Sequence, residues 1–295
     1  MTSIAAYKNG LKWSVQNIKL WGWLYFGNFL LAALAAIPLM NLLEEKLEHT
    51  LASRRLMEGF DFTVFTDFIH EYGAALLPVF SQTPLLIIVY LFLSVFFMGG
   101  ILAVCKRNPQ KVDFQLFAVG AIQYFWRIFR MSLYFLILHG LLIMLFGTLF
   151  MLLIKGGDLK QLDSELVIYT RGMIILAVYL FFAGLLVLIQ DFSKIEMVEN
   201  NHKIVVKSIK IAVITVFRHF KSIFVLALLN WFGFGLIALL YLWLRGDDLN
   251  HSVTELWMIF ILGQFFILLR MGLKVLNLAS KTLLYKNIQS KISTP

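Results

Sequence analysis

Charged residues are scarce in this sequence. Of its 295 residues, 15% are charged and 60% are hydrophobic, and the mean hydropathy is +0.81. Soluble domains carry roughly 25% charged residues, and a soluble domain of this length could not bury so much apolar surface. The composition therefore excludes a soluble globular protein and predicts an integral membrane protein.

Cysteine and catalytic motifs are also lacking. The single cysteine, Cys105, cannot form an internal disulfide and has no CxxC or Cys/His partner at metal-ligand spacing. The chain contains no GxSxG, P-loop or glycine-rich nucleotide motif. His70-Glu71 does not extend to HExxH, because Ala74 stands at the fifth position. We therefore expect no enzymatic activity, no metal site and no cofactor.

Two further pairs could bind a metal ion. They are Glu45/His49 and His251/Glu255, each separated by one helical turn. Each pair supplies only two ligands, whereas structural zinc sites use four and catalytic zinc sites use three protein ligands. We interpret these residues as solvated loop residues.

Long apolar windows fill much of the chain. An α-helix needs about 20 apolar residues to cross the hydrocarbon core of a bilayer. The windows are residues 21–43, 84–105, 131–154, 172–190, 222–244 and 256–276. The sequence thus predicts an all-α polytopic membrane protein with six transmembrane helices, and the even number places both termini on one side.

Basic residues gather in alternate segments between these windows. Residues 1–20, 106–130, 191–221 and 270–295 hold 19 of the 26 lysines and arginines but 4 of the 17 acidic residues. Because lysine and arginine are retained on the cytoplasmic side, both termini are predicted to be cytoplasmic, in a bacterial inner membrane. The net charge of +9 then belongs to loops at the membrane surface. Without a recognition motif it does not indicate a nucleic-acid partner.

An amphipathic stretch precedes the fifth window. One face of a helix with 3.6 residues per turn collects basic residues, and another collects apolar ones. The basic residues are Lys203, Lys207, Lys210, Arg218 and Lys221. The apolar residues are Val206, Ile209, Val213, Phe217 and Phe220. Such a helix lies flat at the membrane interface with its basic side chains on anionic head groups, and an elbow is predicted to join it to the fifth span.

Similar interfacial helices are predicted before the third and the first windows. Residues 113–130 place Arg127 and Arg130 opposite a row of phenylalanines, and residues 7–21 place three lysines opposite aliphatic side chains. All three are expected on the cytoplasmic side. Arg127 and Arg130 are therefore further candidates for contact with lipid head groups.

The elbows resemble one another. Residues 125–140 and 216–231 share an Arg-x-Phe-Arg/Lys step, and His139 and Asn230 each lie 12 residues beyond its first arginine. This similarity predicts a threefold internal repeat, in which each unit is an interfacial helix and a transmembrane hairpin. Three independent hairpins with basic flanks are the alternative. The predicted units are residues 1–105, 106–190 and 191–280, and a basic cytoplasmic tail follows at 281–295.

The segment EMVENNHKIVVKSIKIAVITVFRHFKSIFVLALL resembles a known family. Its acidic residue, basic amphipathic helix and Arg/Phe elbow are similar to those of six-helix bacterial proteins related to the membrane domain of glycerophosphodiester phosphodiesterases. The likeness is strongest from Glu199 to about Leu229. In the phosphodiesterases such a module precedes a soluble catalytic barrel, for which this chain has no room. The resemblance therefore implies a membrane module without that activity.

The largest outer segment covers residues 44–82. Its first part is predicted to continue the first span as a polar helix, and its second part is predicted to be an amphipathic helix on the outer surface, rich in phenylalanine. It could cap the bundle or bind a partner. Alternatively, it only covers the helix ends.

Four polar residues are predicted at membrane depth, where polar side chains are costly and therefore informative. They are Asn28, His139, Asn230 and Gln264. Two interpretations stay open: these side chains form hydrogen bonds that fix helix packing, or they line a polar path. The absence of a mid-span Asp, Glu or Lys disfavours active transport more than a passive or lipid-handling path.

Two functions follow from these observations. The favoured one is a non-enzymatic membrane module that associates with anionic phospholipid through its basic stripes and organises membrane protein partners. The alternative is a transporter or lipid-translocating protein whose path is lined by the four polar residues. A continuous cavity that joins those residues to one face of the bundle favours the alternative, whereas a dry, hydrogen-bonded core favours the module.

Overall fold

The computed structural model describes residues 2–47, 62–108, 112–155, 165–246 and 253–293. Within these ranges the secondary structure is entirely helical, which confirms the all-α prediction. The helices are α1 (Ser3–Gln16), α2 (Ile18–Leu47), α4 (Phe62–Ser81), α5 (Thr83–Arg107), α6 (Phe114–Lys155), α7 (Glu165–Glu199), α8 (Val205–Arg218), α9 (Phe220–Arg245) and α10 (Val253–Ser293). The first part of the outer segment, residues 48–61, lies outside the described residues.

Six helical stretches are long and apolar enough to cross a membrane. They are Ile18–Lys46, Phe65–Arg107, Phe114–Leu152, Tyr169–Glu199, Phe220–Arg245 and Thr254–Ser290. Five of them include a predicted window, and Phe114–Leu152 covers all but the last two residues of the third window, 131–154. The stretches exceed the roughly 20 residues that a bilayer requires, because several helices continue past the apolar window into the packed end of the protein.

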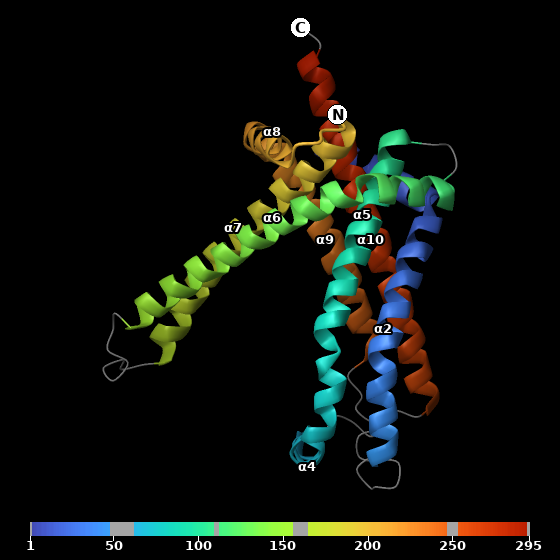
Figure 1. The fold of residues 1–295 in the computed structure, drawn as a ribbon. Coiled ribbons are helices and arrows are strands. Elements are labelled where there is room, and N and C mark those ends of the chain that lie inside the picture. The colour runs from blue at the N-terminus through green and yellow to red at the C-terminus, as the bar shows by residue number, and fades with distance from the viewer. Residues whose placement is uncertain (1, 48–61, 109–111, 156–164, 247–252, 294–295) are drawn as a thin grey trace.

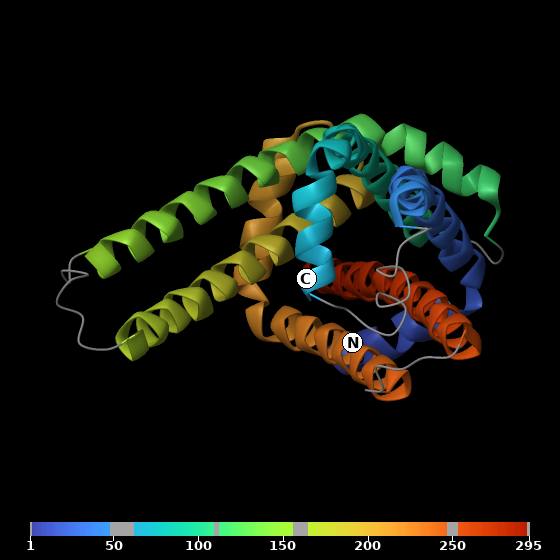
Figure 2. The ribbon, with the colours of Figure 1, turned by 90° about the horizontal axis from the view of Figure 1, so that it is seen from below.

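The two described ends of the chain lie at the same end of the molecule, together with α1 and α8 (Figure 1). We call this the terminal end, and the opposite end, which carries α4, the far end. α2, α5, α9 and α10 run between the two ends, and the hairpin of α6 and α7 leans away from them (Figures 1 and 2). The fold is that of a multi-pass membrane protein.

The core lies at the terminal end, where the helices converge. Every residue from Asp191 to Val198 of α7 is buried, as are Ile101 to Cys105 of α5 and most of Val275 to Tyr285 of α10. Toward the far end the helices expose large apolar side chains such as Ile137 and Leu239, as expected for surfaces that contact lipid chains.

α1 contacts α10 and α9 through a face of small residues. Ser3, Ala6, Gly10 and Ser14 are buried, whereas Ile4, Leu11 and Val15 are exposed. A Cβ on Gly10 would lie 2.8 Å from the Cβ of Ser280 and 2.9 Å from its Cα. Small residues at this spacing let two helix backbones approach closely.

Two one-residue breaks separate the short helices from the long helices that follow them. Asn17 (φ −110°, ψ 42°) lies between α1 and α2, and His219 (φ −117°, ψ 29°) lies between α8 and α9. The elbow predicted before the third window is wrong, because α6 continues unbroken from Phe114 to Lys155.

The packing of α6 explains this difference. One stripe of buried residues follows the helix across the predicted elbow and faces α5, with which α6 makes its most extensive contact. The stripe comprises Phe117, Ala121, Tyr124, Ile128, Met131 and Phe135. A break near residue 130 would rotate half of this stripe away from α5, so the continuous helix buries more apolar surface.

The segment predicted as a basic cytoplasmic tail, residues 281–295, forms the end of α10 in its described part. α10 continues to Ser293, and Lys281, Leu284, Tyr285 and Ile288 are buried. Their spacing places them on one helical face, and this part of α10 packs against α7 and α5. The segment therefore belongs to the core.

The contact between α1 and α10 gives a first prediction. Gly10→Ala should lower the melting temperature of the detergent-solubilised protein, because the added methyl group meets the backbone of Ser280 and overpacking costs about 1–3 kcal/mol. Gly22→Ala is the matched control, since no atom outside its own helix lies within 4 Å of that position. Equal melting temperatures for the two variants would contradict the close approach of the helices.

Candidate functional site

A cavity of about 1460 Å³ lies between α2, α7, α9 and α10 and reaches the junction of α4 and α5. Figure 2 looks along these helices from the far end. Sites for small molecules measure about 300–1000 Å³, so this cavity is larger. On α10 its lining extends from Phe260 to Lys281, about 30 Å of helix at 1.5 Å per residue. That length matches the hydrocarbon thickness of a bilayer.

Most of the cavity wall is apolar. α2 and α9 contribute chiefly aliphatic and aromatic side chains, among them Phe29, Ala32, Ala36, Phe224, Leu228 and Phe234. α7 lines the cavity only between Leu180 and Asp191, because its other half leans away with α6. Toward the far end the cavity therefore lacks an α7 wall.

Polar residues line the cavity along one face of α10. Arg270, Lys274, Asn277 and Lys281 are separated by four, three and four residues, so they project in the same direction. We call them, together with Asp191 and Lys194 of α7, the charged cluster. It occupies the part of the cavity nearest the terminal end, where α7 and α10 meet.

An ion pair joins the two helices within this cluster. The Nζ of Lys281 donates to Oδ2 of Asp191 at 2.6 Å, and the exposed fractions of the two side chains are 5% and 11%. Lys194 is 6% exposed and interacts electrostatically with Asp191, Lys274 and Lys281. Lys274 likewise interacts with Arg270 and Asp191.

Positive charge exceeds negative charge in the cluster. Its four cations, Arg270, Lys274, Lys281 and Lys194, face one carboxylate, that of Asp191. Elsewhere in the described part of the chain, no carboxylate lies within ion-pair distance of Arg270, Lys274 or Lys194. Lys194 is buried and Lys274 is half-buried, whereas Arg270 is exposed. An anion at this end of the cavity would offset the positive charge of the buried and half-buried side chains.

Three of the four polar residues predicted at membrane depth line the cavity. Asn230 Nδ2 donates to the carbonyl of Leu226 at 2.8 Å and lies 3.5 Å from Oγ of Ser280. Asn28 Nδ2 donates to the carbonyl of Leu24 at 2.7 Å, near the sulfur of Met271. Gln264 Oε1 accepts from the hydroxyl of Tyr25 at 2.7 Å.

The structure does not bring His139 to these residues. Its Nδ1 lies 2.8 Å from the carbonyl of Phe135, one turn earlier in α6. Because α6 belongs to the leaning hairpin (Figure 1), His139 is not part of the cavity lining. His139 and Asn230 lie equally far along the sequence from Arg127 and Arg218, but the fold does not bring them together.

The predicted basic stripe of α8 is exposed. Lys203, Lys207, Lys210, Arg218 and Lys221 all lie at the surface. The protein-facing side of α8 consists instead of Val205, Ser208, Ala212 and Val216. Val206 and Phe217 of the predicted apolar stripe are exposed as well, which leaves them free to contact a membrane surface.

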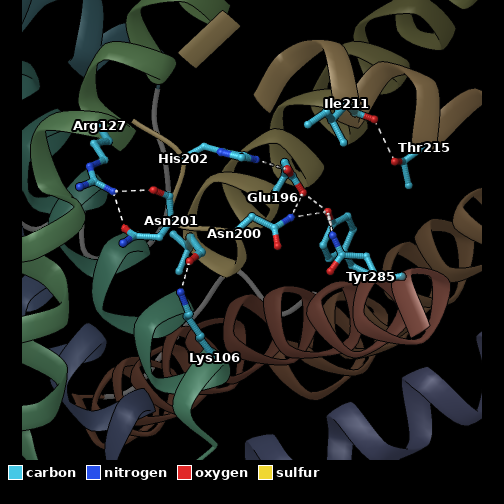
Figure 3. A network of polar contacts seen from close by, with 11 residues as sticks. Lys106, Arg127, Glu196, Asn200, Asn201, His202, Ile211, Thr215 and Tyr285 are labelled. Carbon is cyan, nitrogen blue, oxygen red and sulfur yellow. Dashed lines mark hydrogen bonds and ion pairs between the residues drawn. The ribbon is translucent and has the colours of Figure 1, made fainter. Parts of the chain in front are cut away.

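The two arginines of α6 differ in their surroundings. Arg130 is exposed, and its Nε donates to the carbonyl of Trp126 at 3.3 Å. Arg127 is half-buried, and its Nη1 donates to Oδ1 of Asn201 at 2.6 Å (Figure 3). Its guanidinium also lies over the ring of Tyr124. Arg127 thus ties α6 to the connection between α7 and α8.

A second polar network lies near the end of α7 (Figure 3). The fully buried Glu196 accepts a hydrogen bond from the hydroxyl of Tyr285 and another from Nδ2 of Asn200 at 2.7 Å. His202 Nε2 lies 3.3 Å from its other oxygen. Lys106 Nζ donates to the carbonyl of Val198 at 2.6 Å. The network joins α5, α7 and α10 and so holds the terminal end together.

Sequence reasoning missed the charged cluster, because these residues fall in segments assigned to the cytoplasm, where charges are expected to be solvated. A signal was present. Arg270, Lys274, Asn277 and Lys281 have the same three- and four-residue spacing as the α8 stripe, and they extend an apolar span without a break. Their partner, Asp191, lies 90 residues away, and no local pattern links the two.

Comparison with protein-family models, with curated proteins and with solved structures gives no match to this chain. Among the described residues, no group of three or more His, Cys, Asp or Glu side chains could hold a metal ion. His49 and His251, the histidines of the two pairs considered above, lie outside the described residues.

The ion pair in the charged cluster gives a second prediction. Asp191→Asn should destabilise the protein by about 3–5 kcal/mol, because it leaves Lys281 buried without its partner. Adding Lys281→Met should recover part of the loss, since that variant no longer buries the lysine charge. Thermal unfolding in detergent measures both effects. Lys46→Gln, which breaks an exposed pair with Glu45, should leave the melting temperature unchanged, and an equal loss there would contradict the assignment.

Proposed function

We propose that this protein binds an anionic phospholipid in the cavity, with the head group at the charged cluster and the chains along the apolar walls. The main support for this proposal is that Arg270, Lys274 and Lys281 lie on one face of α10 at one end of a long apolar cavity. Anionic phosphate accepts charge-assisted hydrogen bonds from such side chains. The length of the cavity, and its size beyond that of small-molecule sites, suit a lipid.

The route of entry follows from the leaning hairpin. Because α7 lines only the half of the cavity near the terminal end, a lipid in the bilayer can move in sideways from the hydrocarbon without leaving the membrane. With both termini cytoplasmic, as the charge distribution predicts, the charged cluster lies on the side of the inner leaflet. The lipid would then come from the inner leaflet of a bacterial inner membrane.

The basic stripe of α8 has a separate role in this proposal. Its exposed lysines and arginines contact the head groups of the surrounding leaflet and set the depth of the protein in the membrane. In the proposal, α1, α8 and the first part of α6 serve as interfacial helices. The threefold internal repeat of an interfacial helix and a transmembrane hairpin is likewise part of the proposal. The protein acts without catalysis, as a lipid-binding module that associates with other membrane proteins.

Binding at the charged cluster is tested by native mass spectrometry of the protein released from anionic nanodiscs. The double variant Arg270→Gln/Lys274→Gln should retain at least about tenfold less anionic lipid, because each hydrogen bond to a charged group is worth about 1.5–3 kcal/mol. Lys207→Gln/Lys210→Gln removes the same charge from the exposed stripe and should keep the cavity lipid. If the α8 variant loses more lipid than the α10 variant, the cavity is not the site.

A second function, movement of the lipid across the bilayer, is favoured by the amides along the cavity. Asn230 lies beside Ser280, Asn28 lies beside Met271, and Gln264 lies farthest from the charged cluster. These amides form a row of polar groups that leads a head group from the terminal end toward the far end. The absence of a carboxylate or amine along the row suits passive movement rather than coupled transport.

Lipid movement is tested by the transfer of a fluorescent anionic lipid between leaflets of reconstituted vesicles. Gln264→Leu should slow the transfer several-fold while lipid stays bound, because the row is interrupted beyond the charged cluster. His139→Leu replaces a polar residue of the leaning hairpin and should leave the rate unchanged. Equal rates of lipid transfer for wild type, Gln264→Leu and protein-free vesicles would contradict lipid movement by this protein. The proposal of lipid binding would then stand alone.

A further inference from the structure

The excess positive charge of the charged cluster influences which lipid head group binds there. This inference rests on the lipid site proposed above. Four cations face the single carboxylate of Asp191, so the cluster carries a formal charge of +3. The phosphodiester of a lipid such as phosphatidylglycerol carries one negative charge and would leave +2, shared between the exposed Arg270 and the buried or half-buried lysines.

Burial strengthens the electrostatic effect of this excess positive charge. Lys281 is 4% exposed and Lys194 is 6% exposed, while Lys274 is half-buried. Lys194 does not line the cavity, but it lies one turn beyond Asp191 on α7 and interacts with Lys274 and Lys281. In its protonated form it adds to the positive potential at the cluster without occupying the space for the head group. Solvent screens such charges much less than exposed ones.

The amides beside the cluster supply further hydrogen-bond donors. Asn277 lines the cavity between Lys274 and Lys281 on the same face of α10, and Asn230 faces it from α9. Lysine, arginine and amide groups together offer several donors and one carboxylate acceptor. A terminal phosphate, with three free oxygens, uses more of these donors than a diester, which has two.

We infer that the cavity selects a lipid whose head group ends in a phosphomonoester. Such a group carries a charge of about −1.5 to −2 at neutral pH. It binds between Arg270, Lys274 and Lys281, and the positive potential of Lys194 increases the preference for its second charge. Lys281 keeps its ion pair with Asp191, which fixes the position of the ammonium group.

The test compares two lipids that differ by one methyl group and one charge. Phosphatidic acid and phosphatidylmethanol with identical acyl chains compete for the protein in nanodiscs, and native mass spectrometry counts which of the two stays bound. Phosphatidic acid should bind at least about tenfold tighter, because its phosphomonoester carries more negative charge and one more free oxygen than the diester and so gains about one further hydrogen bond to a charged donor. Lys194→Met should reduce this ratio several-fold.

Lys194→Met is a suitable variant because it replaces a buried lysine that has no carboxylate within ion-pair distance among the described residues, so it breaks no ion pair. Lys274→Gln, which changes a cavity-lining residue, should reduce the ratio further and also lower total binding. Equal binding of the two lipids by the wild type would overturn the inference and leave the lipid site intact. If neither lipid competes for a site sensitive to Arg270→Gln/Lys274→Gln, the lipid site itself is wrong.

Discussion

The ion pair between Asp191 and Lys281 holds α7 against α10 at the point from which the rest of the architecture extends. On the terminal side of this point every residue of α7 up to Val198 is buried, and the polar network around Glu196 and Tyr285 joins α5, α7 and α10. On the other side, α7 leaves the bundle with α6 (Figure 1). The cavity occupies the space between the departing hairpin and the helices that continue to the far end. Because α7 is held against α10 at one end only, it lines only part of the cavity.

Lysines and arginines serve two purposes in this chain, and burial separates them. Those of α8 are exposed and lie on the side of the helix away from its protein contacts. Arg270, Lys274 and Lys281 of α10 line the cavity, and Lys194 of α7 is buried beside it. A basic residue at the surface gains little from an ion partner, because water and salt already screen its charge. Around the buried Lys281 and Lys194, by contrast, Asp191 is the carboxylate present among the described residues of the cluster.

The sequence allowed much of the fold to be predicted, because span length, hydropathy and the distribution of basic residues are local properties. All six apolar spans and the helical nature of the described residues follow from such local patterns. The continuity of α6 did not, since it depends on a stripe that packs against α5. The burial of residues 281–288 could not be predicted either, because an amphipathic helix end has the same sequence pattern whether its polar face contacts water or protein. For the site, Asn28, Asn230 and Gln264 were recognisable by their depth, whereas the charged cluster depends on a contact across 90 residues.

The most direct test of the account is a cryo-EM reconstruction of the protein in nanodiscs that contain phosphatidic acid. The account predicts elongated density inside the cavity, with a phosphate-sized feature within hydrogen-bond distance of Lys274 and Arg270 and with chains along α2 and α9. A cavity that is closed by repacked side chains, or that holds chain density with no feature at the charged cluster, would contradict it.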